Sequence, residues 1–196
     1  MNLVRNERPA LLLIDIQKGF DNLEYWGGHR NNPYAEERAS QLLEHWRLRN
    51  LPIFHIQHCS TIPTSMLHPS NPGNAFKDIV KPLDHETIIW KNVNSAFIGT
   101  NLRERLDDEN ITRLVVAGLT TDHCVSTTVR MAGNYGYDTL LVSDATATFD
   151  KRSPHGQLFP AALIHETALA SLHGEFATVV STNDVVKSLR GLNVAR

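Results

Sequence analysis

The sequence predicts a single α/β domain over residues 1–196, a doubly wound three-layer sandwich built on a six-stranded, mainly parallel sheet. Short apolar runs rich in β-branched residues alternate with segments of helical periodicity, which is the pattern of strand–helix–strand units. The strand-like runs are apolar at consecutive positions, as in "ALLLIDI". Such runs are typical of strands covered by helices on both faces.

Six runs are predicted to be strands and five segments to be helices. The expected strands are 10–16, 51–57, 87–91, 113–119, 139–144 and 176–182. The expected helices are 33–49, 99–107, 121–136, 160–173 and a short last helix from about residue 183. Asn32 and Pro33 suit the cap and first turn of the first helix, and Gly136 suits the residue that follows the third.

Two long irregular stretches, 20–32 and 58–84, are rich in Gly, Pro, Asn and His. Loops of this length in a compact domain usually bind ligands or cover a site. In open parallel sheets, ligands bind beyond the carboxyl ends of the strands. We therefore expect the functional site at that edge of the sheet, bordered by these two loops.

The composition disfavours several classes of protein. The formal net charge of −2 and the lack of a long basic stretch argue against nucleic acid and anionic membranes as partners. No apolar run has the ~20 residues that a membrane helix needs, and the first 20 residues do not read as a signal peptide. The two cysteines, Cys59 and Cys124, make a poor disulfide framework. We expect a cytoplasmic protein in which Cys59 is structural.

Three reactive side chains follow predicted strands. Asp15 ends the first strand, Lys91 ends the third, and Cys124 lies just after the fourth. If the third helix opens at Thr121, its N-terminal dipole lowers the pKa of the Cys124 thiol, and Lys91 acts in the same direction. Asp15 can take up and return a proton. The three residues predict acyl transfer by a cysteine nucleophile, without metal or cofactor.

Each of these residues also has a structural explanation. A lone cysteine in an α/β protein is usually a small buried hydrophobe, and a lysine is usually solvated. An aspartate after a buried strand often caps the next turn. The convergence of all three at strand ends favours the functional interpretation.

Three segments resemble the signature blocks of the isochorismatase-like cysteine hydrolases. They are "LLLIDIQKGF", "IIWKNVNSAFIGTNL" and "VVAGLTTDHCVSTTVRMAGNYGYDTLLVSDATATF", and the resemblance extends from about residue 9 to residue 182. It is nearer to the amidohydrolases similar to streptothricin hydrolase than to the metal-binding nicotinamidases. It implies a Rossmann-like fold and a catalytic triad of Asp15, Lys91 and Cys124.

The resemblance has further implications for the site. It implies a cis peptide bond at Leu119–Thr120 and an oxyanion hole formed by the backbone N–H groups of Thr120 and Cys124. It implies a metal-independent amidohydrolase that cleaves an amide or cyclic amide of a small molecule through a thioester. It also implies a homodimer or homotetramer.

Departures from the family's patterns bear on the chemistry. Nicotinamidases bind a metal through an Asp-x-His pair and a further His, whereas the corresponding region here has His55, His58 and His68 but no Asp in the required place. His55 and His58 are three residues apart on a predicted strand, so they point to opposite faces. We therefore expect no metal. Two alternatives remain: a vinyl-ether hydrolase of the isochorismate type, against which Cys124 argues, and a non-catalytic binding protein.

The substrate contacts are predicted on the loops and strand ends. The predicted set is Gln17, Phe20, Trp26, His58 and Trp90. Aromatic side chains in the 20–32 loop suit a flat or ring-bearing substrate, or pack between subunits. Trp90 has core packing as its structural alternative.

Overall fold

The computed structural model describes residues 8–189, and the predicted six-stranded sheet is confirmed. The strand order is β3-β2-β1-β4-β5-β8, and all five pairings are parallel. The strands are β1 (Ala10–Ile14), β2 (Ile53–His58), β3 (Thr87–Lys91), β4 (Arg113–Leu119), β5 (Asp138–Ala147) and β8 (Thr178–Val180). None of the helices within the described range has the length and apolar character that crossing a bilayer requires.

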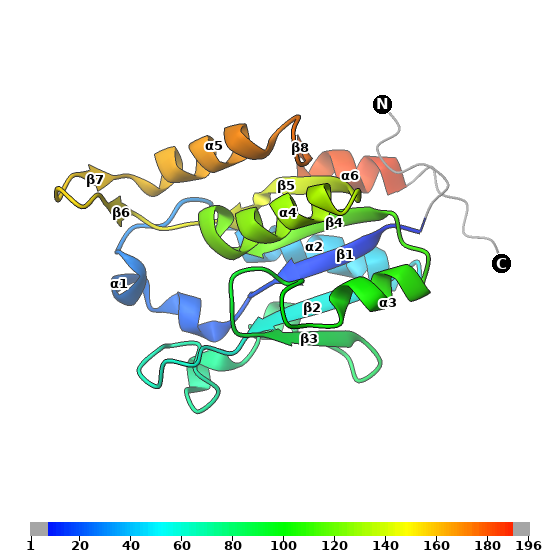
Figure 1. The fold of residues 1–196 in the computed structure, drawn as a ribbon, viewed down its shortest axis with the longest axis horizontal. Coiled ribbons are helices and arrows are strands. Elements are labelled where there is room, and N and C mark those ends of the chain that lie inside the picture. Colours follow the sequence, from blue (N-terminus) through cyan, green and yellow to red (C-terminus); the bar gives the residue numbers. More distant parts are fainter. Residues whose placement is uncertain (1–7, 190–196) are drawn as a thin grey trace.

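Helices cover both faces of this sheet (Figure 1). One face packs against α2 (Ala35–Arg47) and α6 (Thr182–Leu189), and the other against α3 (Leu102–Asp108), α4 (Ser126–Asn134) and α5 (Ala161–Leu172). Side chains of β1 alternate between the two cores: Leu12 and Ile14 belong to one and Leu11 and Leu13 to the other. Each buried Leu or Ile contributes roughly 1.5–3 kcal/mol to folding, so the chain is apolar at every position of this strand.

The two predicted loops contain short helical turns. The first includes η1 (Lys18–Asp21) and α1 (Leu23–Trp26), and the second includes η2 (Pro72–Asn74) and η3 (Asp78–Val80). A small antiparallel hairpin, β6 (Lys151–Arg152) with β7 (Leu158–Phe159), projects beside the first loop (Figure 1). Its strands are too short to produce a sequence pattern.

The expected start of the third helix at Thr121 is wrong in one respect. Thr121–Val125, labelled η4, forms a π-helical turn, and regular α-helix begins only at Ser126. Cys124 therefore lies in a wide turn rather than in the first turn of an α-helix.

The carboxyl ends of β1 and β4 are shaped by close backbone packing. Ile14 and Gly118 are register partners, and a Cβ on Gly118 would lie 2.0 Å from the Ile14 carbonyl oxygen. Gly118 also has a φ of +131°, so only glycine fits there. Asp15 has a φ of +52°, a left-handed conformation that aspartate tolerates better than most residues. The two strands thus end side by side in sharp turns, which brings Asp15 close to the turn that carries Cys124.

Candidate active site

Asp15 is the buried centre of the site. Its side chain is inaccessible to solvent, and Oδ2 accepts a hydrogen bond from Lys91 Nζ at 2.7 Å. Its other oxygen, Oδ1, is buried and has no hydrogen-bond partner among residues 8–189. Buried carboxylate oxygens are almost always paired, so an unpaired one indicates a proton acceptor or a ligand contact.

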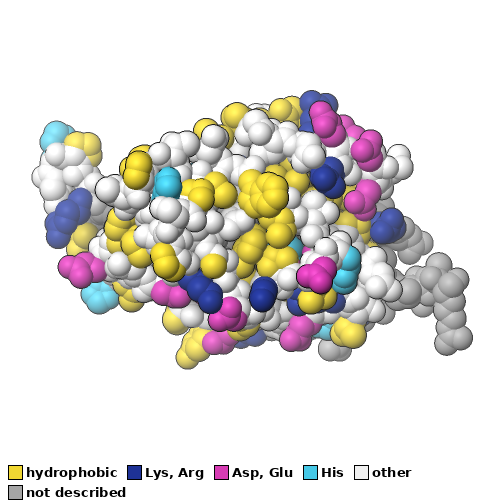
Figure 2. Space-filling view, turned by 90° about the horizontal axis from the view of Figure 1, so that it is seen from below, with side chains coloured by type: hydrophobic (Ala, Val, Ile, Leu, Met, Phe, Trp, Pro, Cys, Tyr) yellow, Lys and Arg dark blue, Asp and Glu magenta, His cyan; other side chains and the backbone are white. Residues whose placement is uncertain are grey.

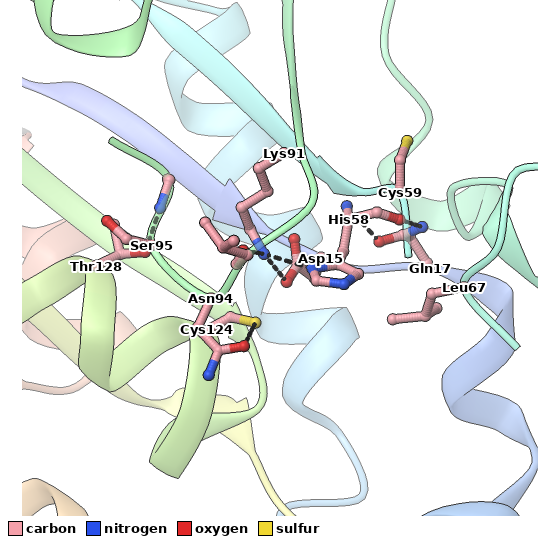
Figure 3. A network of polar contacts seen from close by, with 12 residues as sticks. Asp15, Gln17, His58, Cys59, Leu67, Lys91, Asn94, Ser95, Cys124 and Thr128 are labelled. Carbon is pink, nitrogen blue, oxygen red and sulfur yellow. Dashed lines mark hydrogen bonds and ion pairs between the residues drawn. The ribbon is translucent and has the colours of Figure 1, made fainter. Parts of the chain in front are cut away.

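Lys91 carries the positive charge of the site. Its ammonium donates to Asp15 Oδ2, to His58 Nδ1 at 3.0 Å and to the Val93 carbonyl oxygen at 3.2 Å (Figure 3). Burial alone would lower the pKa of Lys91, but the Asp15 carboxylate and Cys124 outweigh it and raise that pKa. Lys91 therefore stays protonated at neutral pH.

Cys124 lies on the turn that faces this pair. Its thiol donates to Asn94 Oδ1 at 3.8 Å. Its sulfur, a carboxylate oxygen of Asp15 and a ring nitrogen of His58 all lie within 4.8 Å of one another. The structure thus brings Asp15, Lys91 and Cys124 together at the edge of the sheet where they were expected.

The expected lowering of the thiol pKa is wrong. Burial and, after it, the Asp15 carboxylate raise the pKa of Cys124, and the opposing effect of Lys91 is smaller. The resting residue is therefore a neutral thiol. The reason is local: the thiol is removed from water and lies beside the Asp15 carboxylate, and both disfavour the thiolate.

The turn that holds Cys124 is fixed at both ends. The Leu119–Thr120 peptide bond is cis, and the Thr120 carbonyl oxygen accepts hydrogen bonds from the N–H groups of His123 and Val125. Thr121 Oγ1 lies 2.9 Å from Nδ1 of His165, a buried residue of α5. These contacts hold the backbone of the turn on which Cys124 lies.

His58 and Lys91 are register partners at the ends of β2 and β3, which places the imidazole against the ammonium. Burial, and then the Lys91 charge, lower the pKa of His58, while Asp15 opposes them. The ring is therefore neutral at neutral pH. The sequence pointed to His58 as a substrate contact but gave no sign of its bond to Lys91, because that bond depends on strand register.

Gln17 lies in a different environment from the one predicted. It is fully buried, its Oε1 accepts from the His58 N–H, and its Nε2 donates to the carbonyl oxygens of His58 and Asn74. Asn74 Nδ2 also donates to the His58 carbonyl oxygen at 2.8 Å. Gln17 therefore ties the second loop to the site and fixes the His58 backbone.

The aromatic residues of the first loop form a stack. Phe20 is buried, and its ring centroid lies 4.5 Å from that of Trp26 and 6.1 Å from that of Phe149. Trp26 Nε1 donates to the Gly19 carbonyl oxygen. Phe20 also packs in one cluster with Leu119, the residue before the cis bond. This stack forms an apolar support next to Leu119, at the start of the Cys124 turn.

Trp90 is exposed to 65% and donates from Nε1 to Gln57 Oε1, so it is not a core residue. It borders a cavity of about 310 Å³ that reaches Lys91. The cavity is lined by Cys59, Ser60, Thr61, His68, Pro69, Trp90, Lys91, Asn92 and Gly99. A second cavity of about 400 Å³ adjoins Arg47 and Glu86 at the amino ends of β2 and β3, at the opposite end of the sheet from Cys124.

Asp15, His58 and Cys124 have the donor types of a metal site. The Lys91 ammonium, however, lies against both the Asp15 carboxylate and the His58 ring. A cation bound by these three groups would have to displace it. The positive charge that balances the Asp15 carboxylate is therefore the Lys91 ammonium.

Comparison with known proteins places the chain in a family. A model of the isochorismatase domain matches residues 9–184. The chain belongs to the isochorismatase family. The isochorismatase family protein YrdC of Bacillus subtilis is 52% identical over 92% of this chain and 95% of its own length.

Two other similar proteins indicate the breadth of the family. A crystal structure of an isochorismatase-family hydrolase from Chromobacterium violaceum has a TM-score of 0.91 and 44% identity, covering 96% of each chain. The N-carbamoylsarcosine amidase of an Arthrobacter species is 32% identical over 94% of this chain and 72% of its own length. The chain is thus an isochorismatase-family hydrolase with amidases among its relatives.

Proposed function

We propose that this isochorismatase-family hydrolase is a metal-independent cysteine amidohydrolase, which cleaves an amide or cyclic amide of a small molecule through a thioester. The single observation that carries the proposal is that the two carboxylate oxygens of Asp15 have different surroundings. One carboxylate oxygen is held by the Lys91 ammonium, and the other is buried and unpaired in the part of the chain that the structure describes. A carboxylate so arranged, with a thiol nearby, is suited to proton transfer.

In the first half-reaction, Asp15 Oδ1 takes the thiol proton as the Cys124 sulfur attacks the substrate carbonyl carbon. The C–S bond forms and the carbonyl π electrons move to oxygen. When the C–N bond breaks, Asp15 returns the proton to nitrogen, so ammonia or an amine leaves and a thioester remains. Lys91, whose pKa is raised, stays protonated throughout and orients Asp15 through its hydrogen bond to Oδ2.

In the second half-reaction, Asp15 takes a proton from water, and the hydroxyl attacks the thioester carbon. Collapse of this intermediate releases the carboxylic acid and returns the proton to sulfur. Both tetrahedral intermediates carry an oxyanion, for which we propose the backbone N–H groups of Thr120 and Cys124 as donors. One such donor is typically worth ~10²–10³ in rate.

Within this proposal, Phe20 and Trp26 support one side of the substrate, and Trp90 and His58 border another. Gln17 acts through His58 rather than by touching substrate. The amidase named among the relatives supports cleavage of a C–N bond.

The proposal is tested by screening primary amides, lactams and ureides for release of ammonia or amine. Wild type is compared with Cys124→Ser, and Cys59→Ser is the matched control. We expect activity that Cys59→Ser keeps and Cys124→Ser loses, and an acyl adduct on Cys124 by mass spectrometry during turnover. Treatment with EDTA should leave the rate unchanged.

Other outcomes would overturn the proposal. A Cys124→Ala variant that hydrolyses isochorismate-like vinyl ethers at the full rate would identify the vinyl-ether alternative. Binding of small molecules without turnover of any of these classes would identify a binding protein. A rate lost with EDTA and restored by a divalent metal would contradict metal independence.

We also propose that the chain forms a homodimer or homotetramer in the cytoplasm. Apolar side chains gather on the side of the molecule seen in Figure 2, which includes the edge strand β3. Three exposed large apolar residues lie on β3 and the segment after it: Trp90, Val93 and Ile98. Cys59 and Cys124 are both free thiols, in keeping with a reducing compartment. Light scattering after gel filtration tests the assembly, and a monomer at micromolar concentration would overturn it.

A further inference from the structure

We infer that His58 is held as the neutral imidazole protonated at Nε2 and that it is the specificity-determining donor of the site. It would recognise an acceptor oxygen, a carbonyl or a carboxylate, that the substrate carries a few bonds from the scissile amide. The tautomer follows from the structure, whereas the role toward substrate rests on the proposed amidohydrolase function.

The tautomer follows from the hydrogen bonds of Lys91. An ammonium group has three hydrogens and no lone pair, so it can only donate. Its three partners are Asp15 Oδ2, the Val93 carbonyl oxygen and His58 Nδ1. His58 Nδ1 must therefore present its lone pair to the ammonium. In a neutral imidazole the proton is then on Nε2.

The surroundings of the ring keep it neutral. The charged groups facing it are Lys91 and Asp15, and the Cys124 thiol is neutral at rest. A protonated imidazole would place two cationic donors 3.0 Å apart, with no acceptor between them. Burial and the Lys91 charge accordingly lower the pKa of His58.

The Nε2–H group is available to a ligand. It has no hydrogen-bond partner among residues 8–189, and the ring is half-buried. The His58 N–H and carbonyl groups are meanwhile held by Gln17 (Figure 3), and Asn74 also donates to the carbonyl oxygen. A donor fixed in this way needs little ordering when a ligand binds, which is the condition for recognition by one hydrogen bond.

The position of the ring determines what it would recognise. One of its nitrogens lies within 4.8 Å of both the Cys124 sulfur and an Asp15 oxygen. A substrate carbonyl carbon in contact with the sulfur therefore presents its neighbouring atoms to the imidazole. Nδ1 faces the Lys91 ammonium, so Nε2 lies on the other side of the ring, farther from the reacting groups. An acceptor oxygen a few bonds from the scissile carbonyl would reach the Nε2–H, and the Lys91 ammonium behind the ring would favour an anionic one.

The tautomer is tested on the resting protein by ¹⁵N NMR of histidine-labelled material, with the His58 signals assigned by their loss in His58→Asn. We expect a neutral ring with a protonated Nε2 and an unprotonated Nδ1 at neutral pH. A protonated Nδ1, or an imidazolium, would overturn the inference. This measurement needs no substrate, so it stands even if the proposed function fails.

Recognition is tested by the binding of matched amides to the Cys124→Ala variant, which cannot turn them over. Succinamate and 4-oxopentanamide carry an acceptor oxygen, and 4-methylpentanamide has the same shape without one. We expect succinamate to bind ~10–100-fold more tightly than 4-methylpentanamide and 4-oxopentanamide ~2–10-fold more tightly, the typical ranges for one hydrogen bond to a charged and to a neutral group. Equal affinities, or no binding of any of them, would overturn the role in recognition.

Two substitutions of His58 distinguish the roles of its two ring nitrogens. His58→Asn keeps an acceptor near the Nδ1 position and loses the Nε2 donor. In the Cys124→Ala background it should bind the three amides with equal affinity. His58→Gln keeps a donor near Nε2 and should retain the preference at a lower kcat. His85→Gln, at an exposed position, is the matched control. A His58→Asn variant that keeps the full preference would contradict the inference, whereas unchanged turnover in Cys124→Ser would contradict only the proposed function.

Discussion

Two buried clusters at opposite ends of β2 contain the same three kinds of side chain, a histidine, a carboxylate and a cation. At the amino end, Glu86 binds Arg47 through both oxygens and also accepts from His55 Nε2 and the Leu83 N–H. At the carboxyl end, the Asp15 carboxylate accepts through Oδ2 from Lys91, and its Oδ1 has no hydrogen-bond partner within the described range. We call the Glu86 carboxylate saturated, because both oxygens accept hydrogen bonds, and the Asp15 carboxylate unsaturated, because only one does. The saturated carboxylate belongs to a cluster that stabilises the fold, and the unsaturated one to a cluster suited to chemistry.

The largest effect is expected at the unsaturated carboxylate. Asp15→Asn preserves the size of the side chain and its left-handed backbone but removes the proton acceptor. Because positioned acid–base groups contribute ~10²–10⁴ in rate, we expect kcat/KM on the best amide to fall by about 10³, with the far-ultraviolet circular dichroism unchanged. An Asp15→Asn variant within tenfold of wild type would show that Oδ1 has no part in catalysis.

A substitution in the saturated cluster should lower stability and leave catalysis almost unchanged. Glu86→Ala leaves His55 buried without its partner and breaks the ion pair with Arg47. Breaking a buried ion pair typically costs about 3 kcal/mol of unfolding free energy or more, which urea denaturation would measure. We expect kcat/KM to stay within twofold of wild type. If catalysis falls with stability, the two clusters are coupled and the comparison fails.

Much of the fold was predictable because its determinants are local. The continuous apolar runs and the caps around them predict a parallel sheet with helices on both faces, and that sheet is found. The positions of Asp15, Lys91 and Cys124 after strands predicted their meeting at one edge. This worked because the carboxyl ends of parallel strands necessarily share an edge.

What the sequence missed depends on register and on backbone detail. The bond between His58 and Lys91 requires β2 and β3 to align residue for residue. Gln17 was predicted to touch substrate, but its amide is engaged by the backbone of residues distant in sequence. The π-helical turn at Thr121–Val125 has no periodicity of its own, since a single wide turn is too short to show one.

The smallest effect is expected on the titration of the Cys124 thiol, which lies on this turn. Burial and the Asp15 carboxylate raise the pKa of Cys124, so its thiolate should form only above the range of an ordinary thiol. We expect Asp15→Asn to lower that pKa, because it removes a negative charge, and Lys91→Met to raise it further. Thiolate ultraviolet absorbance against pH measures both, in a Cys59→Ser background because burial also raises the pKa of Cys59. A thiolate already present at neutral pH would mean that the unpaired oxygen of Asp15 is not needed to activate the sulfur. The difference in hydrogen bonding between Asp15 and Glu86 would then not explain catalysis.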